Sequence, residues 1–493
     1  MRTNLHAWGT VLALAFAACS PAIAPVVQPP TGQQTAPIAG GTVRTFELTA
    51  APNRIELQPG VAVNAWTFNG TVPGPALRVQ EGDLIQVHLH NRLPVGTTIH
   101  WHGLSVPNGQ DGVAGVTQDP VPPGQSATYS FVASTAGTYW YHSHQDAAAQ
   151  VDRGLYGLLI VDPHGGKAND AVLVYDEWSL GLQMTSPPAS GDPAMSAYVT
   201  VSVNGKAGTA IEPLKVVAGR KFRLRILNAG YLVHFVRLRD VPVTVVAFDG
   251  HEVIGGAPTN DVLPVGPGER LDVELTAPDR AFWIDLQESF PPSAEAALQV
   301  SAAGASPSVR PRPAVTAIRP VLDIFTYGAG APESPWPRGG VPTKTFTLTL
   351  TEVLRTQGPP VKAMPGMDMG EIVYEINGEA FPAMDPLEVT LGDLVAISFV
   401  NHGRQDHPMH LHGHAFQLLE KNGVAVLGVI VKDTVIVRPG TSVTIGFLAD
   451  NPGWWMIHCH QLHHSAAGMM TLLRYAGSPR LAQLGGPLQG KPD

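Results

Sequence analysis

Cysteine is scarce in this sequence, which has 493 residues and only two cysteines, Cys19 and Cys459. Cys19 lies in an apolar leader, so the folded domains contain no second cysteine with which Cys459 could pair. A structural disulfide is therefore excluded. The thiol of Cys459 is an inert packing group, a reactive group or a metal ligand.

Charged residues are also few, at 14% of the chain, whereas 44% of the residues are hydrophobic. This balance excludes a disordered protein and predicts a well-packed globular one. The formal net charge of −9 argues against nucleic acid as a partner, because phosphate binding relies on basic patches. The 52 glycines and 45 prolines favour strands and turns over helices.

The apolar run near the start of the chain is short. It reads VLALAFAAC (11–19), follows Arg2 and cannot span a bilayer, which predicts an export signal. Two cleavage sites compete. An A-x-A-like site ending at Ala24 predicts a signal peptide over 1–24, whereas a lipoprotein box ending at Cys19 predicts a lipid anchor there. We expect an exported bacterial protein that is periplasmic or anchored to the membrane as a lipoprotein.

One unit recurs three times along the chain. A glycine lies nine residues before an asparagine in Gly82–Asn91, Gly219–Asn228 and Gly392–Asn401. An Asn-Gly turn precedes each interval, and a Pro-Gly turn with an alternating strand follows it. Short alternating segments separated by Gly, Pro and Asn are typical of antiparallel sandwiches. The sequence therefore predicts an all-β chain of three consecutive β-sandwich domains.

The repeats and the Pro-rich stretches predict the domain organisation. We expect, in order, a signal peptide (1–24), a linker (25–44), a first domain (45–165), a second domain (166–305), a Pro/Gly-rich linker (306–343), a third domain (344–476) and a tail (477–493).

Histidine pairs occur at equivalent places in the first and third repeats. Nine residues past the repeat asparagine lie His100-Trp101-His102 and His410-Leu411-His412. Eighteen residues past the glycine of the Pro-Gly turn lie His142-Ser143-His144 and His458-Cys459-His460. The second repeat has no histidine at these places, which predicts a domain that acts as a spacer and lets the outer two meet.

Strand geometry explains the spacing of these pairs. Side chains alternate between faces along a strand, so each His-x-His pair directs two imidazoles toward one region. Eight imidazoles are too many for one ion but suit a cluster, for instance three metals with three, three and two ligands. Imidazole binds Cu, Zn, Fe and Ni. The alternative, four ordinary core or surface pairs, does not account for their register with the repeat.

Cys459 points away from the two histidines that flank it, so it marks a second site. Candidate partners are His407, of opposite strand parity to the nearby pair, and His464, five residues after the cysteine. Met469 follows His464 by five residues. A thiolate, two imidazoles and a weak thioether describe a blue-copper electron-transfer site. Zinc is the rival for such a Cys/His set, but it would not explain the imidazole cluster beside it.

Several neighbouring residues are not expected to bind metal. The first repeat has Thr97 and Ser143 at the positions of His407 and Cys459, so we expect one site of the second kind. His414 and His463 lie outside the expected ligand spacing and are interpreted as contacting the ligands or as surface residues. His234, in the second repeat, is interpreted as a core histidine.

Four motifs resemble those of the multicopper oxidase family, in its three-domain bacterial laccase-like branch. They are HWHG (100–103), YHSH (141–144), HPMHLHGH (407–414) and HCHQLHHSAAGM (458–469). The resemblance extends from about residue 45 to residue 476. It implies three cupredoxin-like Greek-key domains and four copper ions, one of type 1, one of type 2 and two of type 3.

The resemblance also implies the ligands of each copper. The type 1 ion would be held by His407, Cys459 and His464, with Met469 as the axial ligand. The type 2 ion would be held by His100 and His410. The six ligands implied for the type 3 pair are His102, His142, His144, His412, His458 and His460.

By the same resemblance, the protein couples four one-electron oxidations at the type 1 copper to the reduction of dioxygen to water. The catalytic route implied runs along His458, Cys459 and His460, which link the two sites. Asp111 resembles the family's acidic group near the type 2 copper and is a candidate proton relay, the alternative being an Asp-Gly turn. Ser465 stands where some bacterial relatives have an acidic residue linked to proton delivery.

The reducing substrate is less well determined. A laccase oxidises phenols or aromatic amines, and an axial Met469 implies a modest potential suited to easily oxidised phenols. The alternative is a cuprous oxidase in copper tolerance, favoured by Met364, Met367 and Met369, because thioethers select Cu(I); the opposing interpretation is a loop with chance methionines. A non-enzymatic copper-binding protein is the third alternative, although none of the ten expected histidines is missing.

Overall fold

The computed structural model describes residues 32–38, 40–179, 198–288, 297–302, 319–354, 372–486, 488 and 490–493. The predicted export signal with Cys19, and the three methionines between 364 and 369, lie outside the described residues. In the part of the chain that is described, no helix combines the length and the apolar character needed to cross a bilayer.

The first sandwich consists of two four-stranded sheets, with strand orders β2-β1-β4-β6 and β3-β8-β7-β5. Its strands are β1 (Val43–Gln58), β2 (Val61–Phe68), β3 (Gly74–Gln80), β4 (Leu84–Asn91), β5 (His100–His102), β6 (Ser126–Val132), β7 (Gly137–His142) and β8 (Tyr156–Asp162). A 3-10 turn, η1 (Asn108–Gln110), and a short helix, α1 (Ala147–Asp152), lie in its connections.

The second sandwich has sheets ordered β11-β10-β9-β13-β18-β15-β16 and β12-β20-β19-β14-β17. Its strands are β9 (Asp170–Ser179), β10 (Tyr198–Val203), β11 (Lys206–Ala207), β12 (Leu214–Val216), β13 (Lys221–Asn228), β14 (His234–Leu238), β15 (Thr244–Phe248), β16 (His251–Glu252), β17 (Leu263–Val265), β18 (Arg270–Thr276), β19 (Phe282–Glu288) and β20 (Ala297–Ala302). Two 3-10 turns, η3 (Gly208–Ala210) and η4 (Ile324–Thr326), lie within it and after it.

The third sandwich has sheets ordered β22-β21-β24-β30-β26-β27, with β28 paired to β26, and β23-β32-β31-β25-β29. Its strands are β21 (Lys344–Leu354), β22 (Ile372–Ile376), β23 (Leu387–Val389), β24 (Leu394–Asn401), β25 (His407–Leu411), β26 (Phe416–Lys421), β27 (Val424–Ala425), β28 (Val431–Lys432), β29 (Thr434–Val437), β30 (Ser442–Leu448), β31 (Trp454–Cys459) and β32 (Met470–Tyr475). Helix α2 (Leu462–Ala466) separates the last two strands.

The prediction of an all-β chain built from three sandwiches is confirmed, and the repeat has a structural cause. In each unit the first strand pairs in parallel with the strand that ends at the repeat asparagine: β1 with β4, β9 with β13, and β21 with β24. The repeat asparagines, Asn91, Asn228 and Asn401, are at most 1% exposed, and each side-chain amide donates to two backbone carbonyls at 2.7–2.9 Å. Because a buried amide must be hydrogen-bonded, the asparagine closes the same loop three times. The residue boundaries predicted for domains, linkers and tail remain predictions.

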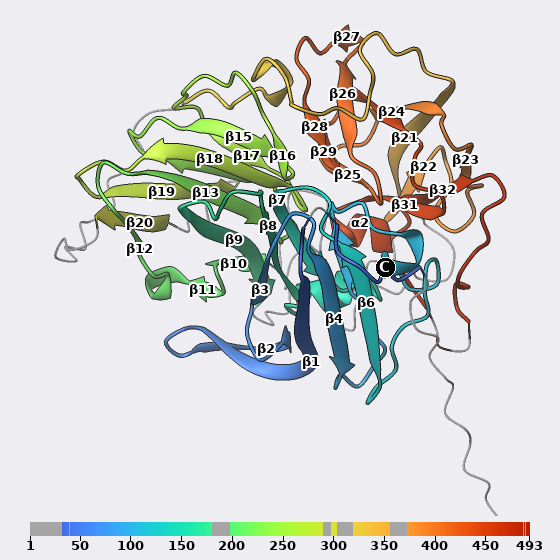
Figure 1. Ribbon diagram of the computed structural model, residues 1–493, viewed down its shortest axis with the longest axis horizontal. Coiled ribbons are helices and arrows are strands. Elements are labelled where there is room, and N and C mark those ends of the chain that lie inside the picture. Colours follow the sequence, from blue (N-terminus) through green and yellow to red (C-terminus); the bar gives the residue numbers. More distant parts are fainter. Residues whose placement is uncertain are drawn as a thin grey trace, which may run out of the picture.

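The three sandwiches meet around one region. In Figure 1 the first unit (blue to teal) and the third (orange to red) face each other near α2, and the second (green) packs against both. Strand β18 of the second unit contacts β7 of the first, β16 contacts β28 of the third, and α1 contacts α2. This arrangement brings together the sheets that carry the histidine pairs.

An ion cluster joins the first and second units. Arg78 contacts Asp162 at 2.6 Å and Asp170 at 2.9 Å, and Arg225 contacts Asp170 at 2.7 Å and Asp272 at 3.0 Å. Burial acts to raise the pKa of Asp170, but the hydrogen bonds and charges of the two arginines outweigh it and lower that pKa below its ordinary value. This carboxylate therefore stays ionised between the two domains.

Candidate metal centre

Strand pairing places the histidine pairs side by side. In the first unit β5 runs antiparallel to β7, with His100 opposite His142. In the third unit β25 runs antiparallel to β31, with His410 opposite His458. Each unit therefore presents four imidazoles, and the packing of the two units unites all eight, as the sequence predicted.

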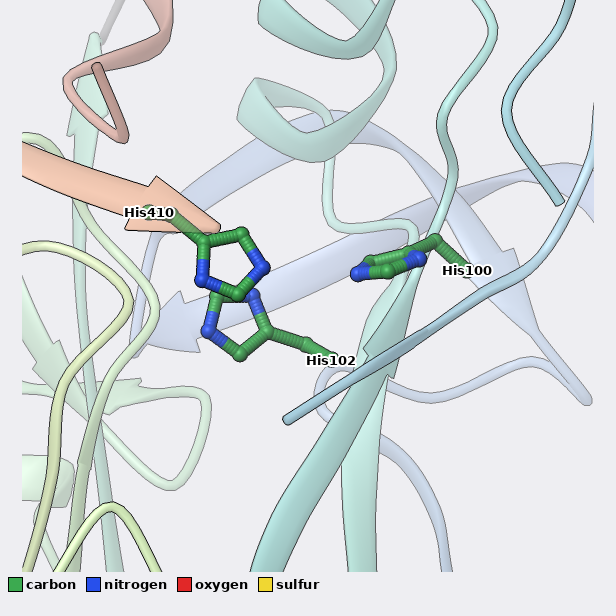
Figure 2. Close-up of side chains that lie close together, drawn as sticks. All are labelled: His100, His102 and His410. Carbon is green, nitrogen blue, oxygen red and sulfur yellow. The ribbon is translucent and has the colours of Figure 1, made fainter. Parts of the chain in front are cut away.

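The eight imidazoles form three groups whose nitrogens lie within 4.8 Å of one another, and each group draws on both outer units. The groups are His100/His102/His410, His102/His142/His460 and His144/His412/His458. All eight residues are at most 1% exposed. Figure 2 shows the first group: the rings of His102 and His410 stack, with centroids 3.8 Å apart, and the ring of His100 points toward them.

One nitrogen of most of these rings is held by the protein while the other is left buried without a partner. Four rings donate from Nδ1 to backbone carbonyls at 2.8–3.3 Å and leave Nε2 without a hydrogen bond: His100, His142, His144 and His410. His102 is the reverse, because its Nε2 contacts Asp433 Oδ1 at 3.0 Å and its Nδ1 has no partner. Buried nitrogens without partners are costly unless they bind something. The donor set therefore fits metal ions.

Burial favours the state of these rings that binds metal. It lowers the pKa below the ordinary value in seven of them: His102, His142, His144, His410, His412, His458 and His460. Desolvation is the main cause because it disfavours the charged imidazolium, and neighbouring histidines add to it. A neutral ring has a lone pair to offer, which a metal ligand needs.

Asp111 lies at the cluster, just after η1, and is 1% exposed. Its backbone carbonyl accepts a hydrogen bond from His100 Nδ1 at 2.8 Å, and its carboxylate lies 3.1 Å from His412 Nδ1. The next residue, Gly112, has a φ of 79°, and a Cβ there would collide with the backbone carbonyl of Ile99. Asp111 is therefore both part of an Asp-Gly turn and a carboxylate directed at two cluster histidines.

Cys459 faces a separate group, as strand parity predicted. Its Sγ lies 3.7 Å from His407 Nδ1 and 3.6 Å from His464 Nδ1, and these two nitrogens are 3.1 Å apart. Met469 is fully buried, accepts a hydrogen bond from the Cys459 N–H through its backbone carbonyl and donates its own N–H to the His464 carbonyl. Burial raises the pKa of the thiol. Such a thiol is deprotonated readily only when a bound metal ion or a comparable positive charge stabilises the thiolate.

Helix α2 positions His464. The side chain of Gln461 caps the helix by accepting hydrogen bonds from the N–H groups of His463 and His464, which leaves the helix start satisfied. The His464 ring stacks on Tyr374, with centroids 4.0 Å apart, and its Nε2 lies 3.0 Å from Gln405 Oε1. These contacts hold Nδ1 toward the sulfur.

The first unit has a polar trio where the third has the thiol group. Thr97 Oγ1 lies 3.2 Å from Ser143 Oγ, and both hydroxyls donate to Gln150 Oε1 at 2.8 Å. These hydroxyls already satisfy one another, so the place is filled without a metal.

Two sequence interpretations are corrected or sharpened. His414 and His463, for which surface positions were an alternative, are only 6% and 4% exposed. His414 contacts the Tyr475 hydroxyl at 2.6 Å and the His412 carbonyl at 3.0 Å, and His463 stacks on Tyr231. His234 is fully buried and pairs with Glu177, in agreement with a core role.

Sequence reasoning missed the groups that form hydrogen bonds with the ring nitrogens facing away from the cluster. Asp433 orients His102 and His410, and Pro492 accepts a hydrogen bond from His144. Asp433 was detectable in principle, because the polar triplet Lys432-Asp433-Thr434 interrupts an otherwise apolar stretch from Val429 to Val437. Pro492 offered no such signal, since it reaches the cluster only through the folding of the chain end.

A cavity of about 910 Å³ lies between α1, α2 and residues of the chain end, among them Leu484, Leu488 and Asp493. Gln150 and Ser465 lie in its wall, together with Asp493, whose carboxylate is 3.9 Å from His458 Nδ1. The cavity is large enough for dioxygen and several water molecules, and Asp493 connects its wall to His458.

Comparison with known proteins places this arrangement in a family. Models described as multicopper oxidase match residues 49–166, 172–304 and 351–477. The multicopper oxidase MmcO of Mycobacterium tuberculosis is 33% identical over 89% of this chain and 88% of its own length. The chain belongs to the multicopper oxidase family. It is therefore an oxidoreductase that binds copper and, like the family, transfers electrons from a reducing substrate to dioxygen.

Two further relatives of this multicopper oxidase have different names. A laccase from Cryphonectria parasitica is 29% identical, covering 87% of this chain and 81% of the relative, and copper resistance protein A from Escherichia coli is 25% identical, covering 89% and 94%. The crystal structure of a multi-copper oxidase from Pseudomonas thermotolerans matches with a TM-score of 0.68 and 26% identity, covering 89% of this chain and all of that one. The cupredoxin-like fold is thus shared along nearly the whole chain.

Proposed function

We propose that this multicopper oxidase is laccase-like: it takes one electron and one proton from each of four phenol or aromatic amine molecules and reduces one dioxygen to two water molecules. The observation that carries the proposal is the pair of adjoining buried sites. The thiol of Cys459 belongs to one site, and the imidazoles of its two sequence neighbours belong to the other. Electrons thus have a short bonded path between the two buried sites.

We propose that the protein binds four copper ions, which the grouping of the histidines supports. His407, Cys459, His464 and Met469 would hold the type 1 ion, and His100 and His410 the type 2 ion. The two type 3 ions would be held by His102, His142 and His460 and by His144, His412 and His458. Copper in these sites supplies one-electron redox chemistry at the thiolate and the four-electron reduction of dioxygen at the cluster.

Asp111 is proposed to hold and pass protons at the cluster. Its carboxylate is buried, lies 3.1 Å from His412 Nδ1 and is 3.2 Å from His100 Nδ1. From this position it fixes both rings with one nitrogen toward the metal. It is also a buried carboxylate in contact with two cluster histidines, a position from which it can hold and release protons.

Copper quantitation with an absorption spectrum of the copper-loaded protein tests the proposal. We expect about four copper ions per chain, an intense blue band from the thiolate and a near-ultraviolet shoulder from the type 3 pair. One copper per chain, or bound zinc, would overturn it. Oxygen uptake with a phenol, measured against release of hydrogen peroxide, then checks that reduction proceeds to water.

Cu(I) is the second candidate substrate, and one observation favours it. The segment with Met364, Met367 and Met369 joins β21 to β22, and both strands reach the thiol site. Glu352 of β21 lies 4.0 Å from His407 Nε2, and Tyr374 of β22 stacks on His464. The two described strands that precede and follow the methionine segment in the sequence therefore both contact the electron-entry site.

Replacing the three methionines with serine separates the two substrates. Cuprous oxidase activity predicts a loss of Cu(I) turnover with phenol oxidation retained. Unchanged Cu(I) turnover would reject the role of the methionines.

We also propose export, with cleavage after Ala24 or lipid attachment at Cys19. The apolar leader supports both. Mass spectrometry of the mature protein decides between them, because only the lipoprotein carries a diacylated Cys19.

A further inference from the structure

A fully buried arginine of the second unit reaches the junction of all three sandwiches. Arg270, the first residue of β18, donates from Nε to the Thr138 carbonyl at 3.1 Å, in the first unit. Within its own unit, Nη1 donates to the Gly268 carbonyl and Nη2 to the Asp249 carbonyl. Its remaining two N–H groups form a fork on the carboxylate of Asp433, in the third unit. All five guanidinium donors are thus satisfied, which ties the three units at one point.

Asp433 connects the anchored Arg270 to the histidine cluster. Its Oδ1 accepts the hydrogen bond from His102 Nε2 at 3.0 Å, and its backbone carbonyl accepts the bond from His410 Nδ1 at 2.8 Å. These are the two stacked rings of Figure 2, one from each outer unit. Thr434 Oγ1 also lies 3.2 Å from His102 Nε2 and 3.1 Å from His410 Nδ1, so Asp433 and its neighbour Thr434 together orient both rings.

Asp433 is itself immobilised by the second unit. The carboxylate of Asp249 accepts hydrogen bonds from the N–H groups of Arg270, Asp433 and Thr434 at 2.9–3.3 Å. Lys432 contacts the same carboxylate at 3.0 Å. The backbone and the side chain of Asp433 are thus both fixed.

The orientation of His102 depends on this contact. Four cluster rings donate from Nδ1 and turn Nε2 toward the cluster, whereas His102 bonds through Nε2 and turns Nδ1 inward. A neutral imidazole has one N–H and one lone pair, so an acceptor at Nε2 leaves the lone pair on Nδ1. Asp433 therefore selects the tautomer in which His102 can join His142 and His460.

A glycine provides independent support. Gly103, which follows His102, has a φ of 87°, and a Cβ built there would lie 2.5 Å from Asp433 Oδ2 and nearer still to Arg270 Nη2. The glycine of the HWHG motif thus leaves the space that the ion pair occupies. The second unit also packs directly on the cluster, because a Cβ on Gly268 would lie 2.7 Å from the His460 ring.

We propose that Arg270 is a positioning residue for the oxygen-reducing cluster, acting through Asp433 to hold His102 Nδ1 and His410 Nε2 toward the metals. The inference rests on the proposed function for the assignment of the cluster. It extends the prediction that the second unit acts as a spacer: among its described residues that unit has no cluster histidine, but it orients two cluster histidines of the outer units.

The test compares Arg270→Gln and Asp433→Asn with Arg225→Gln. Arg225 is a matched control, because it is a second buried arginine of the same unit that contacts Thr138 and two carboxylates but no cluster histidine. Each protein is examined for copper content, the blue thiolate band, the near-ultraviolet type 3 shoulder and apparent melting temperature. The metal-free proteins, labelled with 15N-histidine, are examined by NMR for the tautomer of His102, assigned with a His102 variant.

We expect Arg270→Gln and Asp433→Asn to keep the blue band while losing most of the type 3 shoulder and at least one copper ion. In the metal-free forms, His102 should change from a single Nε2–H tautomer to a mixture. Arg225→Gln should keep the spectrum despite a lower melting temperature, and Arg270→Lys should recover part of the shoulder, because a lysine supplies the charge without the fork.

Two results would overturn the inference: an unchanged shoulder and tautomer in Asp433→Asn, or an equal loss of the shoulder in Arg225→Gln. Asp433→Asn is nearly isosteric and decides the question if Arg270→Gln does not fold. A wild-type protein with fewer than about four copper ions would instead reject the proposed function.

Discussion

The substitution Gly103→Ala tests whether the Arg270–Asp433 pair and the cluster depend on the close approach of the Gly103 backbone to that ion pair. Gly103 has a φ of 87°, and its missing Cβ would lie 2.5 Å from Asp433 Oδ2. An ordinary contact is about 1 Å longer, so the carboxylate and the guanidinium must move by that amount. Both groups are buried and fully hydrogen-bonded, so they cannot swing into solvent.

Two free-energy costs add in the Gly103→Ala variant. An alanine in the left-handed region costs about 1–2 kcal/mol. Overpacking a dense site adds about 1–3 kcal/mol. We therefore expect Gly103→Ala to lower the free energy of unfolding by about 2–5 kcal/mol and to reduce copper loading at the cluster.

Gly124→Ala is the matched control. Gly124 lies in a turn of the same sandwich with a φ of 76°, but a Cβ there meets nothing within 4 Å. It should show only the backbone cost, about 1–2 kcal/mol, and full copper loading. Urea unfolding of the metal-free variants, followed by tryptophan fluorescence, measures the difference. Equal destabilisation of the two variants, with equal copper content, would refute the reasoning.

Three further outcomes are expected. Asp111→Asn should retain its copper content and spectrum while oxygen reduction under substrate saturation slows about 10²–10⁴-fold, the usual contribution of a general acid; unchanged oxygen reduction would remove Asp111 from the proton route. Cys459→Ser should lose the blue band and phenol oxidation but keep the near-ultraviolet shoulder, and a surviving blue band would contradict the ligand assignment. The pKa of Asp170 is lower in the folded state than in the unfolded state. Its contribution to stability is therefore complete above the unfolded pKa and is lost as the pH falls through the folded pKa. In urea titrations, Asp170→Asn should be less stable than wild type near pH 6, and the difference in the free energy of unfolding should shrink at acid pH.

Much of the fold, and the convergence of the histidine pairs, was readable from the sequence because both depend on local rules. Alternation along a strand is enough to separate Cys459 from His458 and His460, and the register of β31 with β25 agrees with that separation. The thrice-repeated asparagine marks the same loop closure in each unit, as the equivalent hydrogen bonds of Asn91 and Asn401 show. Such features need only neighbours within one strand or one repeat.

Tertiary structure alone decided how the ligands are shared and what holds them. His102 lies with His142 and His460 because two domains dock, and no local pattern records that docking. Arg270 and Asp433 are far apart in sequence, so their contact appears only when three sandwiches close on one point. The sequence by itself determined which atoms can bind metal, because side-chain chemistry and strand parity are local. Only the packing of the domains determined which of those atoms face one another, since a buried hydrogen bond needs partners from distant parts of the chain.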